Sequence, residues 1–408
     1  MKCRNCGAPL ELVLIDLGSA PLSNAYLTTV TLRGPESWFP LRVLVCESCW
    51  LVQAESYSIA AEIFDEDYAY FSSFSADWLI HSKQYVDEVT AEFNLDQSSF
   101  VVEVASNDGY LLKNFVDSKI PCLGIEPTAS TARAARAKGV ITLERFFGEG
   151  VAGEIVESEG RADLIVANNV LAHVPEPHNF LDGVRILLAA NGVATFEFPH
   201  LMKLVEQKQF DTIYHEHFAY LSLSATVDLM ARSGLSVFRV QNLPTHGGSL
   251  RVFAQPSISG ARALESSVGE LLQRERDAKM LSPEFYRGFQ DKANTVKNRF
   301  LAFLLDAAGS GKTVVGYGAA AKGNTLLNFA GVGTDLIQYV VDRNPAKQGK
   351  FLPGSRIRIV DEGMLAETRP DFIIIFPWNL KVEVMEQLAY ARSWGARFVT
   401  AIPELLIT

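Results

Sequence analysis

The sequence lacks a long apolar run, a secretory leader and any excess of basic residues. Its longest apolar segment, around residues 372–378, is typical of a buried strand and is far shorter than the roughly 20 residues of a membrane-spanning helix. The N-terminus, which begins Met1-Lys2-Cys3, has no apolar stretch of the secretory kind. Acidic residues outnumber basic ones, 47 to 37, whereas a nucleic-acid partner requires a clustered basic face. These features predict a cytoplasmic protein of roughly two or three domains that binds neither membranes nor nucleic acid.

Cysteine is also scarce, with five in 408 residues, but four of them form two Cys-x-x-Cys pairs, Cys3/Cys6 and Cys46/Cys49. Two such pairs can supply the four thiolates of a tetrahedral zinc site, which has no open position for water and is structural. The alternatives are four unrelated cysteines or two disulfides; the paired spacing argues against the first and the missing leader against the second. Cys122 lies in an apolar segment and is expected to be a small core residue.

Two stretches alternate short apolar runs with helical periodicity, which predicts two α/β units with parallel sheets. In the first unit we expect helices at residues 78–93, 130–138 and 179–190, and strands at 100–105, 122–125, 140–143, 163–167 and 193–198, closed by a hairpin of 235–242 and 250–255. That layout resembles class I methyltransferases. Helices are expected across residues 261–308, and strands of the second unit at 313–318, 338–341, 371–376 and 397–402. The predicted domains are a zinc module (1–72), a methyltransferase domain (73–270) and a C-terminal Rossmann-like domain (271–408).

The first unit carries acidic residues where its strands end. Glu103 precedes the turn 105–109, and Glu126 ends the second strand, where a carboxylate can accept both hydroxyls of a ribose. The turn has only one glycine, Gly109, and therefore does not match the G-x-G-x-x-G of dinucleotide sites. The pattern favours S-adenosylmethionine over a dinucleotide.

The densest polar and aromatic cluster is residues 214–220, Tyr-His-Glu-His-Phe-Ala-Tyr. A metal site using His215 and His217 has no third ligand at a usual spacing, and a surface loop would be an uneconomical use of rare residue types. Acid–base catalysis fits best, because His217 titrates near neutrality and a neighbouring carboxylate or tyrosine can orient it. His173 follows the fourth strand at the rim of the same site; a histidine held by a loop carbonyl is the alternative there.

In the second unit, residues 316–324 (Gly-Tyr-Gly-Ala-Ala-Ala-Lys-Gly-Asn) join a strand to a helix. Small residues let backbone N–H groups approach a phosphate, and Lys322 adds charge, although a helix-packing turn would look similar. With Arg343 after the next strand, a wall facing a nucleotide diphosphate is the better interpretation. Lys347 and Lys350 are expected in a solvated loop.

Taken as an ordered set, these motifs resemble sugar C-methyltransferases, which act on nucleotide-linked 4-keto deoxysugars; the 3-C-methyltransferases of kijanose and tetronitrose biosynthesis are the nearest type. The shared segments are the cysteine pairs and residues 21–24, 103–110, 214–217, 246–251 and 316–324. The resemblance implies S-adenosylmethionine and structural zinc, with His217 as the base and Tyr214, Glu216 and His173 beside it. The expected cofactor contacts are Glu103, Ala105, Asn107, Asp108, Gly109, Glu126, Asn168, Tyr68 and Tyr70. The expected substrate contacts, between domains, are Asn24, His246, Gly247, Tyr317, Gly318, Lys322, Asn324 and Arg343.

The expected reaction is removal of a proton next to the ketone, at carbon 3 of a dTDP-linked 4-keto-deoxysugar, followed by methylation of the enolate. One departure from ordinary methyltransferases is that Ala105 and Ser106 stand where glycines are common. The alternatives are O- or N-methylation of a sugar nucleotide, a nicotinamide-dependent oxidoreductase that uses the C-terminal unit, and a nucleotide-sugar sensor without catalysis.

Overall fold

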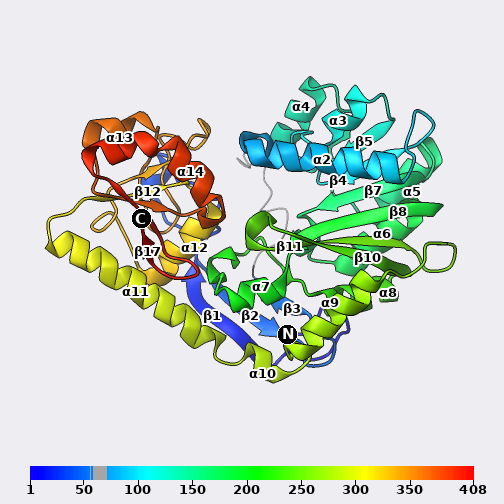
Figure 1. Cartoon of the computed structure of the whole chain (residues 1–408), viewed down its shortest axis with the longest axis horizontal. Coiled ribbons are helices and arrows are strands. Elements are labelled where there is room, and N and C mark those ends of the chain that lie inside the picture. The colour runs from blue at the N-terminus through cyan, green and yellow to red at the C-terminus, as the bar shows by residue number, and fades with distance from the viewer. Residues whose placement is uncertain (56, 58–70) are drawn as a thin grey trace.

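Three β-sheets organise the part of the chain that the computed structural model describes, residues 1–55, 57 and 71–408. Figure 1 shows two lobes that stand side by side, one built from β4–β8 with β10 and β11 and the other from the C-terminal elements. The N-terminal sheet lies between and below them, and helices α9 to α11 run along the lower edge from one lobe to the other.

The N-terminal sheet was not anticipated from the sequence. It is antiparallel, in the order β1-β2-β3-β9, and consists of β1 (Leu12–Ala20), β2 (Phe39–Val45), β3 (Val52–Ala54) and β9 (Ala219–Tyr220). Because β9 begins two residues after His217, the sheet fixes one end of the predicted catalytic segment. Leu27 also forms a β-bridge with Phe351, which ties the N-terminal segment to the C-terminal lobe.

The second sheet has seven strands in the order β10-β11-β8-β7-β4-β5-β6. The strands are β4 (Val101–Val104), β5 (Cys122–Ile125), β6 (Thr142–Leu143), β7 (Ala162–Asn168), β8 (Leu188–Pro199), β10 (Leu235–Leu243) and β11 (Ser249–Pro256). The five parallel strands and the closing antiparallel hairpin confirm the predicted layout. The predicted helix 179–190 was too long at its end: α6 stops at Leu187, and Leu188 already begins β8.

Helices cover both faces of this sheet: α2 (Ala76–Glu92), α3 (Leu112–Asp117), α4 (Ala129–Ala137), α5 (Glu149–Ser158), α6 (Pro177–Leu187), α7 (Leu201–Glu206) and α8 (Leu223–Arg232), with short 3-10 turns η2 (Ser72–Phe74), η3 (Leu171–His173), η4 (Phe210–Thr212) and η5 (Thr245–Gly247). The hydroxyl of Ser75 caps α2 by accepting the amide of Trp78 at 3.3 Å. Residues Tyr85, Val86 and Val89 bury one face of α2 against the sheet.

The C-terminal sheet has the order β14-β13-β12-β15-β16-β17 and is parallel except for its last pair. It contains β12 (Val314–Tyr317), β13 (Val340–Val341), β14 (Ile359–Val360), β15 (Phe372–Ile375), β16 (Arg397–Thr400) and β17 (Leu406–Ile407). The remaining helices are α9 (Ser266–Asp277), α10 (Pro283–Tyr286), α11 (Phe289–Gly309), α12 (Ala321–Ala330), α13 (Gly363–Thr368) and α14 (Lys381–Gln387), with the 3-10 turns η6 (Trp378–Leu380) and η7 (Ala389–Trp394). A further 3-10 turn, η1 (Thr31–Arg33), lies between β1 and β2 of the N-terminal sheet. The α/β fold with an N-terminal zinc module is therefore as predicted, and none of the described helices is long and apolar enough to cross a membrane.

One hydrophobic core joins the N-terminal sheet to the C-terminal lobe. Buried Leu14 and Ile15 of β1 belong to the same cluster as Phe300 of α11 and Ile374 of β15. Because interiors pack at crystal-like density, a shared core holds these parts in one arrangement. Cys122 packs at the edge of another cluster, and burial raises the pKa of its thiol to about 11, as expected of a core residue.

Candidate active site

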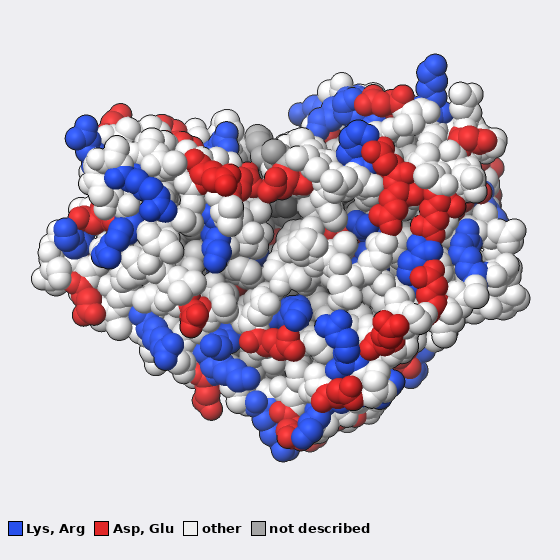
Figure 2. Space-filling model, viewed as in Figure 1, with Lys and Arg blue, Asp and Glu red and all other residues white. Residues whose placement is uncertain are grey.

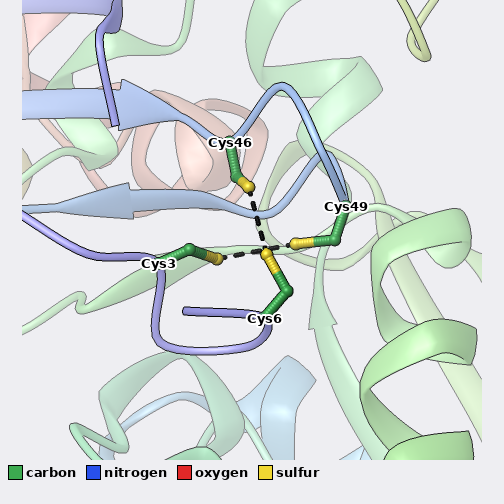
Figure 3. A group of neighbouring side chains, drawn as sticks. All are labelled: Cys3, Cys6, Cys46 and Cys49. Carbon is green, nitrogen blue, oxygen red and sulfur yellow. Dashed lines mark hydrogen bonds between the residues drawn. The ribbon is translucent and has the colours of Figure 1, made fainter. Parts of the chain in front are cut away.

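The four paired cysteines converge on one point, as Figure 3 shows. Cys3 and Cys6 lie in a turn that Gly7 closes, and Cys46 and Cys49 lie in the turn between β2 and β3. All four sulfur atoms lie within 4.8 Å of one another, with Cys3–Cys49 and Cys6–Cys46 contacts of 3.5 Å. Four sulfurs at about 2.3 Å from a central zinc ion need this spacing, so the residues fit a closed structural zinc site.

The turn after β4 has an unusual backbone. Ala105, Asn107 and Gly109 all have positive φ, at 57°, 50° and 75°. Alanine in this left-handed region is strained, which explains why glycine is common at that position in other methyltransferases. Strain that the surrounding fold maintains is typical of a ligand-binding turn.

Buried oxygen acceptors gather where β4, β5 and β7 end. Within the described residues, one oxygen each of Glu103, Asp108 and Asn168 is buried without a hydrogen-bond partner. Glu126 accepts the amides of Asn107 and Thr128 at 2.9 and 3.0 Å. Burial, and then the charges of Glu126 and Asp108, raise the pKa of Glu103 well above its usual range.

A group of buried hydrogen-bond acceptors fits a ligand that carries an ammonium group and hydroxyl donors, as S-adenosylmethionine does. Asp108 is already paired with Lys138 at 2.8 Å and accepts from Ser73, so its remaining oxygen is the one available. The predicted contacts Tyr68 and Tyr70 lie outside the described residues.

Two imidazole rings meet beside this site. The ring centroids of His173, in η3, and His217 are 4.6 Å apart. Nδ1 of His173 donates to the carbonyl of Glu216, and Nδ1 of His217 donates to the carbonyl of Thr212, both at 2.8 Å. A carbonyl only accepts, so Nδ1 carries the proton and Nε2 is the basic atom of each ring.

Both rings are neutral at pH 7. Burial lowers the pKa of His173 to about 4, and burial followed by the charge of His173 lowers the pKa of His217 well below its usual range. The ring of Tyr214 lies 4.1 Å from that of His217, so the predicted cluster is assembled. His215 points elsewhere and bonds the carbonyls of Phe39 and Pro40.

Asn24 reaches the catalytic segment from the N-terminal module. Its amide nitrogen donates to Glu216 at 2.7 Å. The hydroxyl of Tyr26, two residues further along, donates to the carbonyl of Ala319 at 2.6 Å, in the Gly-rich turn of the C-terminal lobe. Residues 23–26 thus connect Glu216 with the C-terminal lobe.

The predicted substrate contacts of the C-terminal lobe fall into two groups. Lys322 and Asn324 lie on the side toward the rest of the chain. Asn324 donates to the carbonyl of Ser23 at 2.5 Å, and Lys322 lies over the ring of Trp378, whose indole N–H donates to Asp211 at 2.7 Å. Tyr317 instead packs inside the lobe, with its hydroxyl on Gln387 at 3.2 Å, and Gly318, at φ 89°, packs against Pro377. Arg343 is exposed.

Lys347 was wrongly placed in a solvated loop by the sequence analysis. Its side chain is only 11% exposed and donates to the carbonyl of Ala319 at 2.8 Å. It lies 5.4 Å from the ring centroid of Tyr26. Lysine stems pack well on apolar surface, and no local pattern around residue 347 signals that Tyr26 covers it.

A buried ion network supports the turn that carries His246 and Gly247. Glu197, at the end of β8, accepts from Arg251 at 3.0 Å, from Thr245 at 3.0 Å and from His81 at 2.9 Å. His246 has φ 54° and packs its ring edge against Trp78 at 5.2 Å. A side chain at Gly247 would lie 2.5 Å from Trp378, so glycine permits the contact with the C-terminal lobe.

Sequence reasoning missed Glu197, Asp211 and Trp378, none of which belongs to a recognisable motif. The hollow between the two lobes is visible in Figure 2, with acidic residues on both of its rims. The catalytic segment, the cofactor turn and Lys322 thus come from three parts of the chain.

Three sequence-family models match the chain: a putative zinc binding domain at residues 3–64, a methyltransferase domain at 79–240 and a C-methyltransferase C-terminal domain at 244–403. The C-methyltransferase NovU of Streptomyces niveus is 35% identical over 403 residues, which cover 99% of this chain and 96% of that protein.

Among solved structures, magnesium protoporphyrin IX methyltransferase of Synechocystis PCC 6803 with bound S-adenosylmethionine matches with 16% identity and a TM-score of 0.32, over 43% of this chain and 79% of that chain. A methyltransferase of Anabaena variabilis matches with 14% identity and a TM-score of 0.36, over 43% and 85%. At these TM-scores the structural matches support no conclusion about this chain. The full-length match and the three family models do: the chain is an S-adenosylmethionine-dependent, zinc-binding methyltransferase and belongs to the C-methyltransferase family that its motifs resemble.

Proposed function

We propose that this enzyme removes a proton from a carbon next to the ketone of a nucleotide-linked 4-keto-deoxysugar and methylates that carbon. The observation that carries the proposal is the state of His217: a neutral imidazole whose Nδ1–H is bound to Thr212 and whose basic atom is Nε2. A partly buried imidazole that is unprotonated at neutral pH, with its basic nitrogen free of the backbone, can accept the proton of a C–H bond next to a ketone. We place the reaction at carbon 3 of a dTDP-linked sugar, on the resemblance noted above.

The residues divide the work as follows. His217 takes the proton, and the rings of Tyr214 and His173 lie 4.1 and 4.6 Å from its ring, with His173 near the reacting carbon. Glu216, which precedes His217 in the chain, is held by a hydrogen bond from Asn24. Glu103, Asp108, Glu126 and Asn168 would hold S-adenosylmethionine, which when bound supplies an electrophilic methyl group.

Two alternatives are less well supported. O- or N-methylation needs a base near a hydroxyl or amine but does not need two neutral imidazoles. A nicotinamide site in the C-terminal unit would need the carboxylate of Asp342 for a ribose, yet Asp342 accepts the amides of Ala319 and Asn344, both at 2.8 Å. A cytoplasmic location is part of the proposal, because a four-thiolate zinc site requires reduced cysteines.

The test is mass spectrometry of thymidine- and cytidine-linked 4-ketosugars incubated with methyl-deuterated S-adenosylmethionine. We expect the label on a sugar carbon, and its loss in His217→Asn. His215→Gln, two residues away, is the matched control and should retain transfer, since Nε2 of His215 bonds the carbonyls of Phe39 and Pro40. A label on oxygen or nitrogen, or full transfer by His217→Asn, would contradict the proposal.

A further inference from the structure

The first turn of α12 lies against the segment that carries the base. α12 packs on η4, and the hydroxyl of Thr325 donates to the carbonyl of Ile213 at 2.8 Å. The preceding residue, Thr212, supplies the carbonyl that holds His217. Lys322 lies one helical turn before Thr325 on the same face of α12, so it approaches the base from the C-terminal lobe.

The side chain of Lys322 contacts two neutral groups, which do not neutralise its positive charge. Its Nζ lies 4.5 Å from the ring centroid of Trp378 and donates to Asn379 at 2.6 Å. The indole N–H of Trp378 donates to Asp211 at 2.7 Å, and Asp211 is 1% exposed. Burial lowers the pKa of Lys322 to about 8, although the negative charge of Asp211 acts to raise it. Burial raises the pKa of Asp211 to about 7, although the positive charge of Lys322 acts to lower it.

The charge of the ammonium group acts on the nearby imidazole rings. After burial, the charge of Lys322 is among the influences that lower the pKa of both His217 and His246. An ammonium group has three N–H donors, and across residues 1–55, 57 and 71–408 only Asn379 accepts one from Lys322. Two donors therefore remain for a ligand beside the base.

We propose that Lys322 donates a hydrogen bond to the ketone oxygen of the substrate and stabilises the negative charge that this oxygen gains as His217 removes the neighbouring proton. This inference rests on the proposed function. In the step, the C–H bond breaks, the proton passes to Nε2 of His217, and the electron pair moves through the new C=C bond onto the ketone oxygen. Lys322 keeps its own proton and acts by hydrogen bonding and charge.

A phosphate of the sugar nucleotide is the other anion that Lys322 could bind, as the sequence pattern suggested. The ketone oxygen fits the surroundings better, because the base must reach the carbon that adjoins the ketone, and Lys322 shares the surroundings of that base. A donor of reduced pKa in a partly buried position also suits charge that appears only during the reaction. The exposed Arg343, after β13, is a more accessible contact for a permanently charged phosphate.

The test compares wild type and Lys322→Met in two assays: steady-state methylation, and exchange of the sugar C–H with deuterated water. We expect kcat and the exchange rate to fall about 10²–10³-fold, as when an oxyanion donor is removed, with KM changed less than about threefold. Lys297→Met is the matched control, since Lys297 also lies over an aromatic ring, 4.7 Å from Phe329, but on α11; it should change neither rate.

Each other outcome is decisive. A raised KM with kcat and exchange intact would make Lys322 a phosphate contact and overturn the inference. If Lys322→Met does not fold, Lys322→Gln, which keeps a neutral donor, is used instead. Loss of C–H exchange in Lys322→Gln would support the inference, and an unchanged exchange rate would overturn it. Absence of exchange and methylation in the wild type would overturn the proposed function itself, and this inference with it.

Discussion

At the scale of single residues, the neutral state of His217 results from a backbone hydrogen bond and from burial of its ring. The carbonyl of Thr212 fixes the tautomer. Burial, and then the charge of His173, lower the pKa of His217 so far that the ring is not protonated at neutral pH. The sequence identified His217 as a candidate base, but it could not show the tautomer, because the accepting carbonyl belongs to a residue chosen by backbone folding and not by side-chain type.

The pH dependence of catalysis follows from this lowered pKa. A base is active when unprotonated, and a folded-state pKa well below 6.5 keeps His217 unprotonated as the pH falls. We therefore expect kcat/KM for the ketosugar to stay constant from neutrality down to pH 6.5 and to decline only below it. His173→Asn removes a ring whose positive form, populated only in acid, opposes protonation of His217, so the acid limb should move to higher pH. An acid limb at or above 6.5 in the wild type would refute this reading.

At the scale of elements, the turn between β4 and α3 carries the clearest conflict between local preference and fold. Gly109 has φ 75°, and a Cβ atom at this position would lie 3.0 Å from Val140 and 3.1 Å from Ala135. The position therefore requires glycine because of both its backbone conformation and the lack of space. Ala105 adopts φ 57° without being glycine. The turn is held in this form by Glu126, which accepts the amide of Asn107.

Substitutions in this turn should separate strain from crowding. Ala105→Gly relieves a left-handed cost of ~1–2 kcal/mol but adds an entropic cost of ~0.5–1 kcal/mol, so we expect urea unfolding to show a net gain of about 0.5 kcal/mol. Gly109→Ala adds both strain and crowding and should cost about 2 kcal/mol or more. Gly139→Ala, at φ 82° with nothing within 4 Å, is the control for strain alone. Equal losses for Gly109→Ala and Gly139→Ala would contradict the role of crowding.

The predictability of each element from sequence depended on the length of its pattern. The five parallel strands and their hairpin were recognisable because β4, β5, β7 and β8 are apolar runs separated by helical segments. The N-terminal sheet was not, since β3 has three residues and β9 two, and their pairing joins distant parts of the chain. The end of α6 was misplaced because Leu188 and Ala189 suit a helix equally well, and no glycine or proline marks the change to β8.

At the scale of the whole molecule, the site exists only where the three parts meet. The N-terminal module supplies Asn24 and Tyr26, the middle sheet supplies His173 and the catalytic segment, and the C-terminal lobe supplies Lys322. Sequence periodicity could propose the boundaries 1–72, 73–270 and 271–408, which remain predictions. It could not show that β9, from the middle of the chain, completes the N-terminal sheet.

The zinc site is linked to the base through that same sheet. Cys46 and Cys49 close the turn between β2 and β3, β3 pairs with β9, and β9 begins two residues after His217. The other pair is anchored to the methyltransferase lobe, because Asn5 donates to Asp228 at 2.8 Å and its carbonyl bonds His178 at 2.9 Å. Loss of the metal should therefore disturb the base more than the cofactor turn, which lies at the ends of β4 and β5.

Cys49→Ser tests this coupling. We expect metal analysis to find about one zinc per wild-type chain and a reduced content in the variant, since a four-thiolate site has lost one ligand. Misplacing a catalytic group by ~1 Å can cost ~10²-fold, so kcat should fall at least about tenfold. The affinity for S-adenosylmethionine, measured by calorimetry, should change less than about threefold, because Glu103 and Glu126 lie on other strands. Cys122→Ser, which removes a thiol outside the cluster, should keep zinc and kcat. If Cys49→Ser lost zinc but kept its full kcat, the metal would stabilise only its own module, and the path through β3 and β9 to His217 would have no catalytic consequence.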